Sequence, residues 1–196
     1  MKLALVGCGR VSERHIEAVR AVEGIDISVV CDIDEKKAQT VSGQLSVPYL
    51  TDYKQLRDVD VVSVMTPSGM HPRHVIEIAE HTNIPYIICE KPVSLTQREL
   101  YEMYDRVNKA EKKLLPVFQN RYNPLIVFLK DLIDTCKLGM IYQFVCNIFW
   151  NRDDDYFGID WHGTKAYDGG VFYTQASHYV DMIYFLFGKI TNAYGV

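Results

Sequence analysis

Two residues at one end of an apolar run have the chemistry of proton transfer. Glu90 and Lys91 follow the run 86–89 (Tyr-Ile-Ile-Cys), which is typical of a strand buried on both faces. Ligands of doubly wound sheets bind outside the carboxyl ends of the strands, so we expect Lys91 to face a cofactor crevice. Desolvation there would lower its pKa and let it hydrogen-bond a reacting hydroxyl. Pro92 would fix the chain direction, with a cis bond as one option; the alternative is a lysine in a surface loop.

A glycine-containing turn near the N-terminus predicts a dinucleotide site. It separates an apolar strand, 2–6, from a helical pattern, 11–22, and the third glycine position holds Ser12. Such a turn lets the backbone approach a pyrophosphate, which the N-terminus of the helix attracts. The alternative is a plain tight turn. The cofactor residues predicted in this turn are Gly7, Gly9, Arg10 and Val11.

Asp32 ends the second apolar strand about 20 residues after this turn, where an acid bonds the adenosine ribose. A carboxylate accepts hydrogen bonds from both ribose hydroxyls and repels a 2′-phosphate. No arginine follows Asp32 directly, and Lys36 and Lys37 lie one helical turn away. We therefore predict NAD rather than NADP as the cofactor. The alternative is a helix-capping acid.

Strands and helices alternate through the first 119 residues, which predicts an α/β fold with a Rossmann doubly wound parallel sheet. Asp34 is the expected N-cap of the second helix. Strands are expected at 2–6, 25–32, 60–65, 84–89 and 114–118, and helices at 11–22, 34–45, 71–81 and 96–113.

The pattern changes after Phe118, which predicts a second, incomplete α+β domain at 120–196 for substrate binding and dimerisation. Helices are expected at 124–137 and 172–187, and strands at 140–150 and 189–196, with an irregular segment at 152–167 between them. A partial sheet exposes unpaired edges and apolar faces. We expect this domain to pair with another copy or with a missing C-terminal half.

Composition restricts the class of protein. The 196 residues carry a formal net charge of −4, which argues against a general nucleic-acid binder. Five cysteines form no C-x-x-C pair and indicate reduced residues in the cytoplasm. No apolar run approaches the length of a membrane span.

The order of several motifs along the chain resembles the Gfo/Idh/MocA oxidoreductase family. The motifs after the glycine turn are TPSGMH (66–71), CEKP (89–92), QNRYNP (119–124) and DGG with TQASHYVD (168–181). Several segments, among them WNRDDDYF (150–157), look most like the sugar-nucleotide branch of this family. That branch includes WlbA-type enzymes, which oxidise C3 of UDP-N-acetylglucosaminuronic acid for lipopolysaccharide sugar synthesis.

The resemblance implies roles for single residues. Lys91 matches the lysine that contacts the reacting sugar hydroxyl, and His178 matches the histidine that acts as general base or proton relay. Asp181 lies on the same helical face as His178 and would orient its imidazole or raise its pKa; the alternative is a core histidine. Many relatives carry Asp or Asn where this chain has Thr174, which cannot act as a base near neutral pH. The remaining cofactor residues implied are Thr66, Pro67, His71 and Glu90.

Further polar residues are candidates for substrate binding. Arg121 would hold a carboxylate or phosphate, or else form an interdomain salt bridge. Trp161 and Tyr156 would pack on a sugar or uracil ring, or else anchor their loop. Asp153, Asp154 and Asp155 do not converge, so no metal site is expected. The complete substrate set is Asn120, Arg121, Tyr122, Arg152, Tyr156, Trp161, Thr174 and His178.

These residues predict an enzyme that transfers a hydride from a sugar hydroxyl to NAD. Deprotonation of the hydroxyl needs an uncharged base, so activity should rise with pH. The alternatives are a remnant that binds NAD without turnover, a dehydrogenase of a free sugar or inositol, and a reductase working in the opposite direction.

Overall fold

The computed structural model describes residues 1–158 and 161–195. Its N-terminal part is a six-stranded, all-parallel sheet with strand order β3-β2-β1-β4-β5-β6, which is the order of a dinucleotide-binding Rossmann domain. The predicted fold class is therefore confirmed. The strands are β1 (Lys2–Val6), β2 (Asp26–Cys31), β3 (Tyr49–Leu50), β4 (Val61–Val64), β5 (Tyr86–Cys89) and β6 (Lys113–Pro116).

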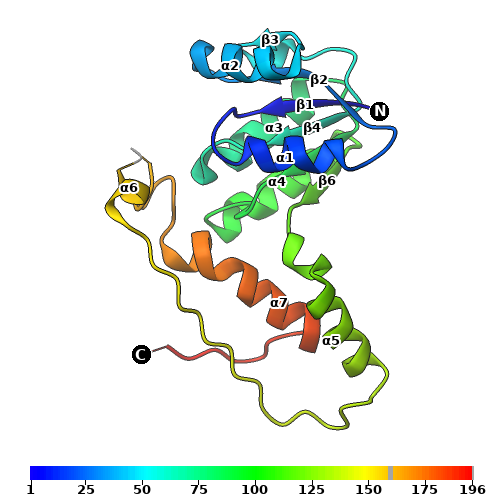
Figure 1. Ribbon diagram of the computed structural model, residues 1–196, viewed down its shortest axis with the longest axis vertical. Helices are drawn as coiled ribbons and strands as arrows, with labels where there is room; N and C mark the ends of the chain where they lie inside the picture. Colours follow the sequence, from blue (N-terminus) through cyan, green and yellow to red (C-terminus); the bar gives the residue numbers. More distant parts are fainter. Residues whose placement is uncertain (159–160, 196) are drawn as a thin grey trace.

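Helices cover both faces of this sheet (Figure 1). α1 (Ser12–Arg20) and α2 (Glu35–Leu45) bury Ile16 and Val41 in one apolar cluster with Leu3 and Leu5 of β1. α3 (His71–His81) and α4 (Gln97–Lys109) bury a second cluster on the other face. Alternate residues of the central strands therefore enter two separate cores, which explains why these strands are largely apolar.

Side-chain caps fix where two of these helices begin. Asp34 accepts hydrogen bonds from the backbone N–H groups of Lys36 and Lys37, as predicted. Thr96 caps α4 by accepting from the N–H of Glu99. Each cap satisfies N–H groups that have no partner inside the helix.

The second region leads away from the sheet (Figure 1). It begins at a 3₁₀ turn, Gln119–Tyr122, and contains α5 (Pro124–Asp134) and the short α6 (Asp154–Phe157). A π-helical segment, Phe172–Ala176, continues directly into α7 (Ser177–Phe187), which a glycine, Gly188, ends at positive φ. Both long helices predicted here are thus present.

The two predicted strands of the second region are wrong. Neither 140–150 nor 189–195 forms a strand, and Val196 lies outside the described residues. An apolar run becomes a strand only when a neighbour takes up its backbone N–H and C=O groups. No described segment pairs with either run, and 140–150 spans the long connection between α5 and α6 (Figure 1).

His74 and three cysteines are buried in the NAD-binding domain. His74 is 7% exposed, and its Nδ1 lies 2.8 Å from Thr66 Oγ1. His74 is buried because it lies on the face of α3 that packs on the sheet. Cys8, Cys31 and Cys89 are buried free thiols, whereas Cys136 is exposed.

Candidate active site

The predicted cofactor residues lie at one edge of the sheet because every strand of the sheet is parallel. Gly7 follows β1, Asp32 follows β2, Thr66 lies two residues beyond β4, and Glu90 follows β5. The topology therefore brings together four loops that are far apart in the sequence.

The glycine turn has the shape that a pyrophosphate needs. Gly7 has φ +101°, and a Cβ there would lie 2.8 Å from the backbone of Met65. Only glycine fits such a position without strain. A Cβ on Gly9 would meet nothing within 4 Å, so the turn is open on that side. Ser12 donates its hydroxyl to the carbonyl of Gly9 at 2.6 Å and starts α1, whose N-terminus attracts anions.

Two backbone N–H groups hold the carboxylate of Asp32 in place beside the glycine turn. One carboxylate oxygen, Oδ2, accepts the N–H of Cys8 at 2.7 Å, and Oδ1 accepts the N–H of Asp34 at 2.9 Å. Each oxygen keeps a further lone pair for a ribose hydroxyl. The carboxylate of Asp32 thus stabilises the glycine turn through Cys8. Its remaining lone pairs lie beside the turn, where they can accept hydrogen bonds from an adenosine ribose.

A buried chain of hydrogen bonds orients Glu90. Ser63 Oγ lies 3.0 Å from His15 Nδ1, and His15 Nε2 lies 2.8 Å from Glu90 Oε1. Burial would raise the pKa of Glu90, but the hydrogen bond from His15 and the neighbouring charge of Lys91 outweigh it and lower that pKa. Glu90 is therefore a fixed negative charge. These contacts give His15 the role of holding Glu90.

Lys91 lies where the two regions meet. Its Nζ donates to the carbonyl of Thr174 at 2.6 Å, and the Lys91–Pro92 bond is cis. Burial lowers the pKa of Lys91. A lysine of this kind gives up its proton more readily than one in water, which suits a group that exchanges a proton with substrate.

His178 is the second titratable group of the site. It is 6% exposed, its Nε2 lies 3.5 Å from Gln119 Nε2, and its Nδ1 has no partner among the described residues. Burial lowers the pKa of His178, and the charge of Lys91 lowers it further. The positive charge of Lys91 therefore favours the neutral form of His178.

Asp181 does not hydrogen-bond His178, although its charge raises the pKa of that histidine, as the sequence suggested. Its carboxylate receives both donors of the Arg121 guanidinium, at 2.8 Å and 2.5 Å. This pair ties the turn 119–122 to α7 inside the second region. The fork of Arg121 is therefore occupied by an internal partner rather than by an interdomain salt bridge or a free anion site.

The irregular segment brings Arg152 and Tyr156 to the glycine turn. The guanidinium of Arg152 lies 4.2 Å from the ring centre of Trp150 and 4.4 Å from that of Tyr156. Arg10, in the glycine turn, lies 5.6 Å from the same tyrosine ring. A cation held between aromatic faces near the cofactor edge is placed to meet an anionic substrate group.

Three other candidate substrate residues are not among the residues at the cofactor edge. Tyr122 is 81% exposed, and Asn120 uses its carbonyl to close the turn before α5. Trp161 packs on His162, whose Nδ1 lies 2.7 Å from the carbonyl of Tyr156; this favours loop anchoring. These positions follow from contacts that no sequence pattern encodes.

His71 is buried beneath the cofactor edge rather than on it. It is 1% exposed, and its ring nitrogens lie 2.8 Å from the carbonyl of Pro92 and 2.7 Å from that of Thr66. Both nitrogens are engaged, so His71 joins the loops after β4 and β5. A direct contact of its ring with the nicotinamide does not fit this geometry.

No group of three potential metal ligands occurs among the residues that the structure describes. Asp153 instead caps α6 by accepting the N–H of Tyr156 at 3.1 Å. The same described residues include no helix with the length and apolar character of a membrane span.

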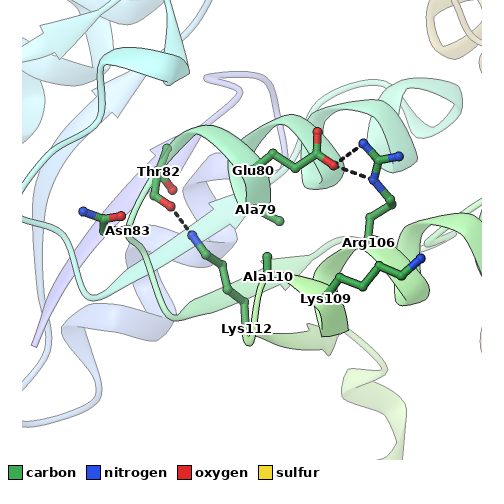
Figure 2. Close-up of a pocket in the computed structure, with 8 residues that line it drawn as sticks. All are labelled: Ala79, Glu80, Thr82, Asn83, Arg106, Lys109, Ala110 and Lys112. Atoms are coloured by element: carbon green, nitrogen blue, oxygen red, sulfur yellow. Dashed lines mark hydrogen bonds and ion pairs between the residues drawn. The ribbon is translucent and has the colours of Figure 1, made fainter.

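Two surface grooves lie away from this cluster. One is between α3 and α4, where Lys112 donates to the carbonyl of Thr82 and Arg106 pairs with Glu80 (Figure 2). It lies near the amino ends of β5 and β6, at the edge opposite the candidate site. The second groove, lined by 19–27 and 44–45, lies near the amino end of β2.

Two family models match the chain, and together they cover most of it. Residues 1–118 match the oxidoreductase family with NAD-binding Rossmann fold, and residues 126–196 match the GFO/IDH/MocA C-terminal domain. The chain belongs to the Gfo/Idh/MocA oxidoreductase family. Its cofactor is NAD, as the glycine turn and Asp32 predicted.

Solved structures similar to this chain include two sugar-nucleotide dehydrogenases. The WlbA dehydrogenase of Chromobacterium violaceum, in complex with NADH and UDP-GlcNAcA, is 36% identical with a TM-score of 0.88. WlbA of Bordetella pertussis, with the same two ligands, is 30% identical with a TM-score of 0.91. In both cases the match covers 96% of this chain and 55% of the other.

Curated relatives are more distant. The uncharacterised oxidoreductase YrbE of Bacillus subtilis is 26% identical over 97% of this chain and 55% of its own length. Inositol 2-dehydrogenase of Salmonella typhimurium is 27% identical over 71% of this chain and 43% of its own. The chain spans about half the length of the relatives it matches.

Proposed function

We propose that this chain takes part in the NAD-dependent oxidation of a nucleotide-sugar hydroxyl, with C3 of UDP-N-acetylglucosaminuronic acid as the reacting position. The observation that carries the proposal is the placement of Lys91 at the cofactor edge, half-buried and held by the carbonyl of Thr174. The two WlbA structures bound to UDP-GlcNAcA support the substrate class.

In this proposal Lys91 accepts the proton of the substrate, and His178 passes it on. The uncharged amine of Lys91 accepts the proton of the sugar hydroxyl as its oxygen becomes a carbonyl oxygen. His178, whose pKa burial and Lys91 both lower, is neutral at physiological pH and relays that proton onward. Glu90, fixed by His15, keeps a negative charge behind the ammonium that forms. NAD⁺ supplies the redox chemistry by accepting the hydride from the sugar carbon.

Arg152 is the proposed anion-binding residue. Its guanidinium lies against Trp150 and Tyr156, and a uronic acid sugar linked to UDP offers both a carboxylate and a diphosphate. Arginine binds either group through parallel hydrogen bonds. A neutral free sugar would leave this cation without a partner.

A dehydrogenase of inositol or a free sugar is the second candidate, supported by the inositol 2-dehydrogenase relatives. A polypeptide that binds NAD without turnover is the third. Mixing the chain with NAD⁺ and either UDP-GlcNAcA or myo-inositol, and following reduced-nicotinamide absorbance, separates them. Absorbance with UDP-GlcNAcA alone supports the proposal, absorbance with inositol alone replaces it, and NAD binding without either signal indicates the third candidate.

Lys91→Met tests the chemical role directly. We expect kcat to fall by about 10²–10⁴-fold, the usual loss when a proton-transfer group is removed, with NAD affinity retained. Lys109→Met is the matched control, because Lys109 is exposed on α4 and pairs with Asp105. Full turnover by Lys91→Met would contradict the assignment.

The pH profile of the native chain gives a second measure. Lys91 must be uncharged to accept a proton, so kcat/KM should rise with pH. Because burial lowers the pKa of Lys91, the rise should be centred below the ordinary lysine value of about 10.4. A profile centred at or above that value would argue against Lys91 as the base.

The division at residue 120 and the assembly of the second region stay proposals. We place the boundary there because β6 ends at Pro116 and the turn 119–122 leads directly into α5. We propose that the second region pairs with another copy or with further family-type sequence, since many of its apolar side chains are exposed. Light scattering of the purified chain would test for a second copy.

A further inference from the structure

Asp168 is a buried carboxylate that the proposed reaction does not yet use. It is 3% exposed. One oxygen, Oδ2, accepts the backbone N–H of Gly163 at 2.5 Å, whereas Oδ1 is buried and has no hydrogen-bond partner among the described residues. A buried acceptor without a donor is destabilising unless a ligand supplies one.

Close backbone contacts hold the segment around Asp168 against the NAD-binding domain. The N–H of Gly69 donates to the carbonyl of Tyr167 at 3.0 Å, and a Cβ on Gly69 would lie 2.1 Å from the carbonyl oxygen of Ala166. Gly169 has φ +73°, and a Cβ there would lie 2.6 Å from Leu95 Cδ2. Glycines on both sides of this contact thus bring the segment within backbone distance of the loop after β4.

Asp168 is near enough to Lys91 for its charge to raise the pKa of that lysine, against the lowering by burial. The charges that act on Lys91 are the carboxylates of Glu90 and Asp168 and the guanidinium groups of Arg10 and Arg152; His178 is the titratable group whose pKa Lys91 in turn affects. Glu90 is engaged with His15, so Asp168 is the acid with an uncommitted oxygen.

Three further buried polar atoms of this part of the chain lack partners among the described residues: Arg152 Nε, Ser177 Oγ and His178 Nδ1. They comprise a cationic donor, a hydroxyl and an imidazole nitrogen. A guanidinium donor suits an anionic group, whereas the hydroxyl and the imidazole nitrogen can each bond a polar group.

We propose that Asp168 is a specificity-determining residue, whose Oδ1 accepts a hydrogen bond from a substrate hydroxyl other than the one that Lys91 deprotonates. This inference rests on the proposed function. An ionised carboxylate only accepts hydrogen bonds, so it selects a donor and rejects phosphate or carboxylate. In UDP-GlcNAcA oxidised at C3, C1, C2 and C5 carry the nucleotide, the acetamido group and the carboxylate. The remaining ring hydroxyl, at C4, is the proposed partner.

The test compares binding of UDP-GlcNAcA and its 4-deoxy analogue to the chain saturated with NADH, measured by calorimetry. A site that bonds a hydroxyl rejects the analogue that lacks it. We expect the native chain to bind UDP-GlcNAcA about 10–100-fold more tightly than the analogue. The variant Asp168→Asn keeps an oxygen that can accept the N–H of Gly163 but loses the charge, and should reduce this ratio to about 1–3-fold.

A second measurement locates Asp168 without substrate. The pH dependence of Lys91 acetylation, followed by mass spectrometry, reports the pKa of Lys91. Removing a nearby negative charge lowers the pKa of an ammonium group, so Asp168→Asn should shift the profile to lower pH. The matched control is Asp155→Asn, since Asp155 is an exposed acid of α6.

The outcomes separate the two proposals. Equal binding of UDP-GlcNAcA and the 4-deoxy analogue by the native chain overturns the role of Asp168 while the proposed function stands; this comparison needs no variant to fold. An unshifted acetylation profile in Asp168→Asn also overturns it. If the NADH-bound native chain binds neither ligand, the proposed substrate is wrong and the role of Asp168 falls with it.

Discussion

The NAD-binding domain and the second region of this chain are built in different ways. Of the buried apolar side chains among the described residues, all but Leu186 lie between Leu3 and Val107. In the second region large apolar side chains lie at the surface, including Leu125 at 76%, Phe149 at 94% and Tyr194 at 96% exposed. The first domain therefore has cores of its own, whereas the described part of the second region has none.

The difference in burial separates the source of stability from the source of the site's geometry. Burial of apolar surface is the main favourable term in folding, so the first domain should account for most of the free energy of unfolding. The second region meets it through polar and close backbone contacts at the site, among them Lys91 to Thr174 and Gly69 to Tyr167. Site geometry therefore depends on the less stable half.

A leucine-to-alanine substitution in each region should give the largest difference in the free energy of unfolding. Leu5 is 0% exposed in β1, and Leu125 is 76% exposed in α5. Leu5→Ala should lower the free energy of unfolding by about 3–5 kcal/mol, through lost burial and a cavity. Leu125→Ala should change it by no more than about 0.5 kcal/mol. Urea denaturation followed by circular dichroism measures both, and similar losses would mean that the second region has a core after all.

Acid should weaken the first domain through His74. Burial lowers the pKa of His74 from 6.5 to about 4. Between these values the unfolded chain binds a proton that the folded chain does not, so stability decreases as the pH falls from 6.5 toward 4. The full effect is about 3 kcal/mol.

His74→Gln should flatten this part of the stability profile, measured by urea denaturation at a series of pH values. The control replaces His81, which is exposed at the end of α3. A profile that stays equally steep in His74→Gln would show that another group causes the acid sensitivity.

Gly69→Ala should disrupt the contact between the two regions. Its effect, on the barrier to turnover, should be smaller in energy than the two stability changes above. The added Cβ would lie 2.1 Å from the carbonyl oxygen of Ala166, so the segment near Asp168 must move away. We expect NAD affinity to be retained and turnover of UDP-GlcNAcA to fall at least about 10-fold, or about 1.4 kcal/mol in the barrier.

The matched variant is Gly43→Ala in α2, where a Cβ meets nothing within 4 Å. It should leave turnover unchanged and raise stability by about 0.5–1 kcal/mol, because alanine favours a helix. If Gly69→Ala also leaves turnover unchanged, the contact between the regions does not shape the site.

Local sequence determined much of the first domain and little of the second. The alternation of apolar strands and helices, the glycine turn and Asp32 were sufficient to predict the Rossmann sheet and NAD. These signals are local, since periodicity and turn chemistry act within a few residues. They failed at β3, where two residues give no pattern, and at 140–150, where an apolar run has no strand to pair with.

The candidate site shows the same division between sequence and tertiary structure. The sequence by itself nominated Lys91 and His178 as catalytic candidates, because Lys91 closely follows an apolar strand and both match motifs of a known family. Only the tertiary structure assigned Asp181 to Arg121, buried His71 between two carbonyl groups, and left Asp168 buried with one oxygen unpartnered among the described residues. Hydrogen-bond partners are set by which loops meet in space. Gly69 contacts Tyr167, and Lys91 contacts Thr174, because a parallel sheet gathers its loops at one edge and glycines let a distant segment approach.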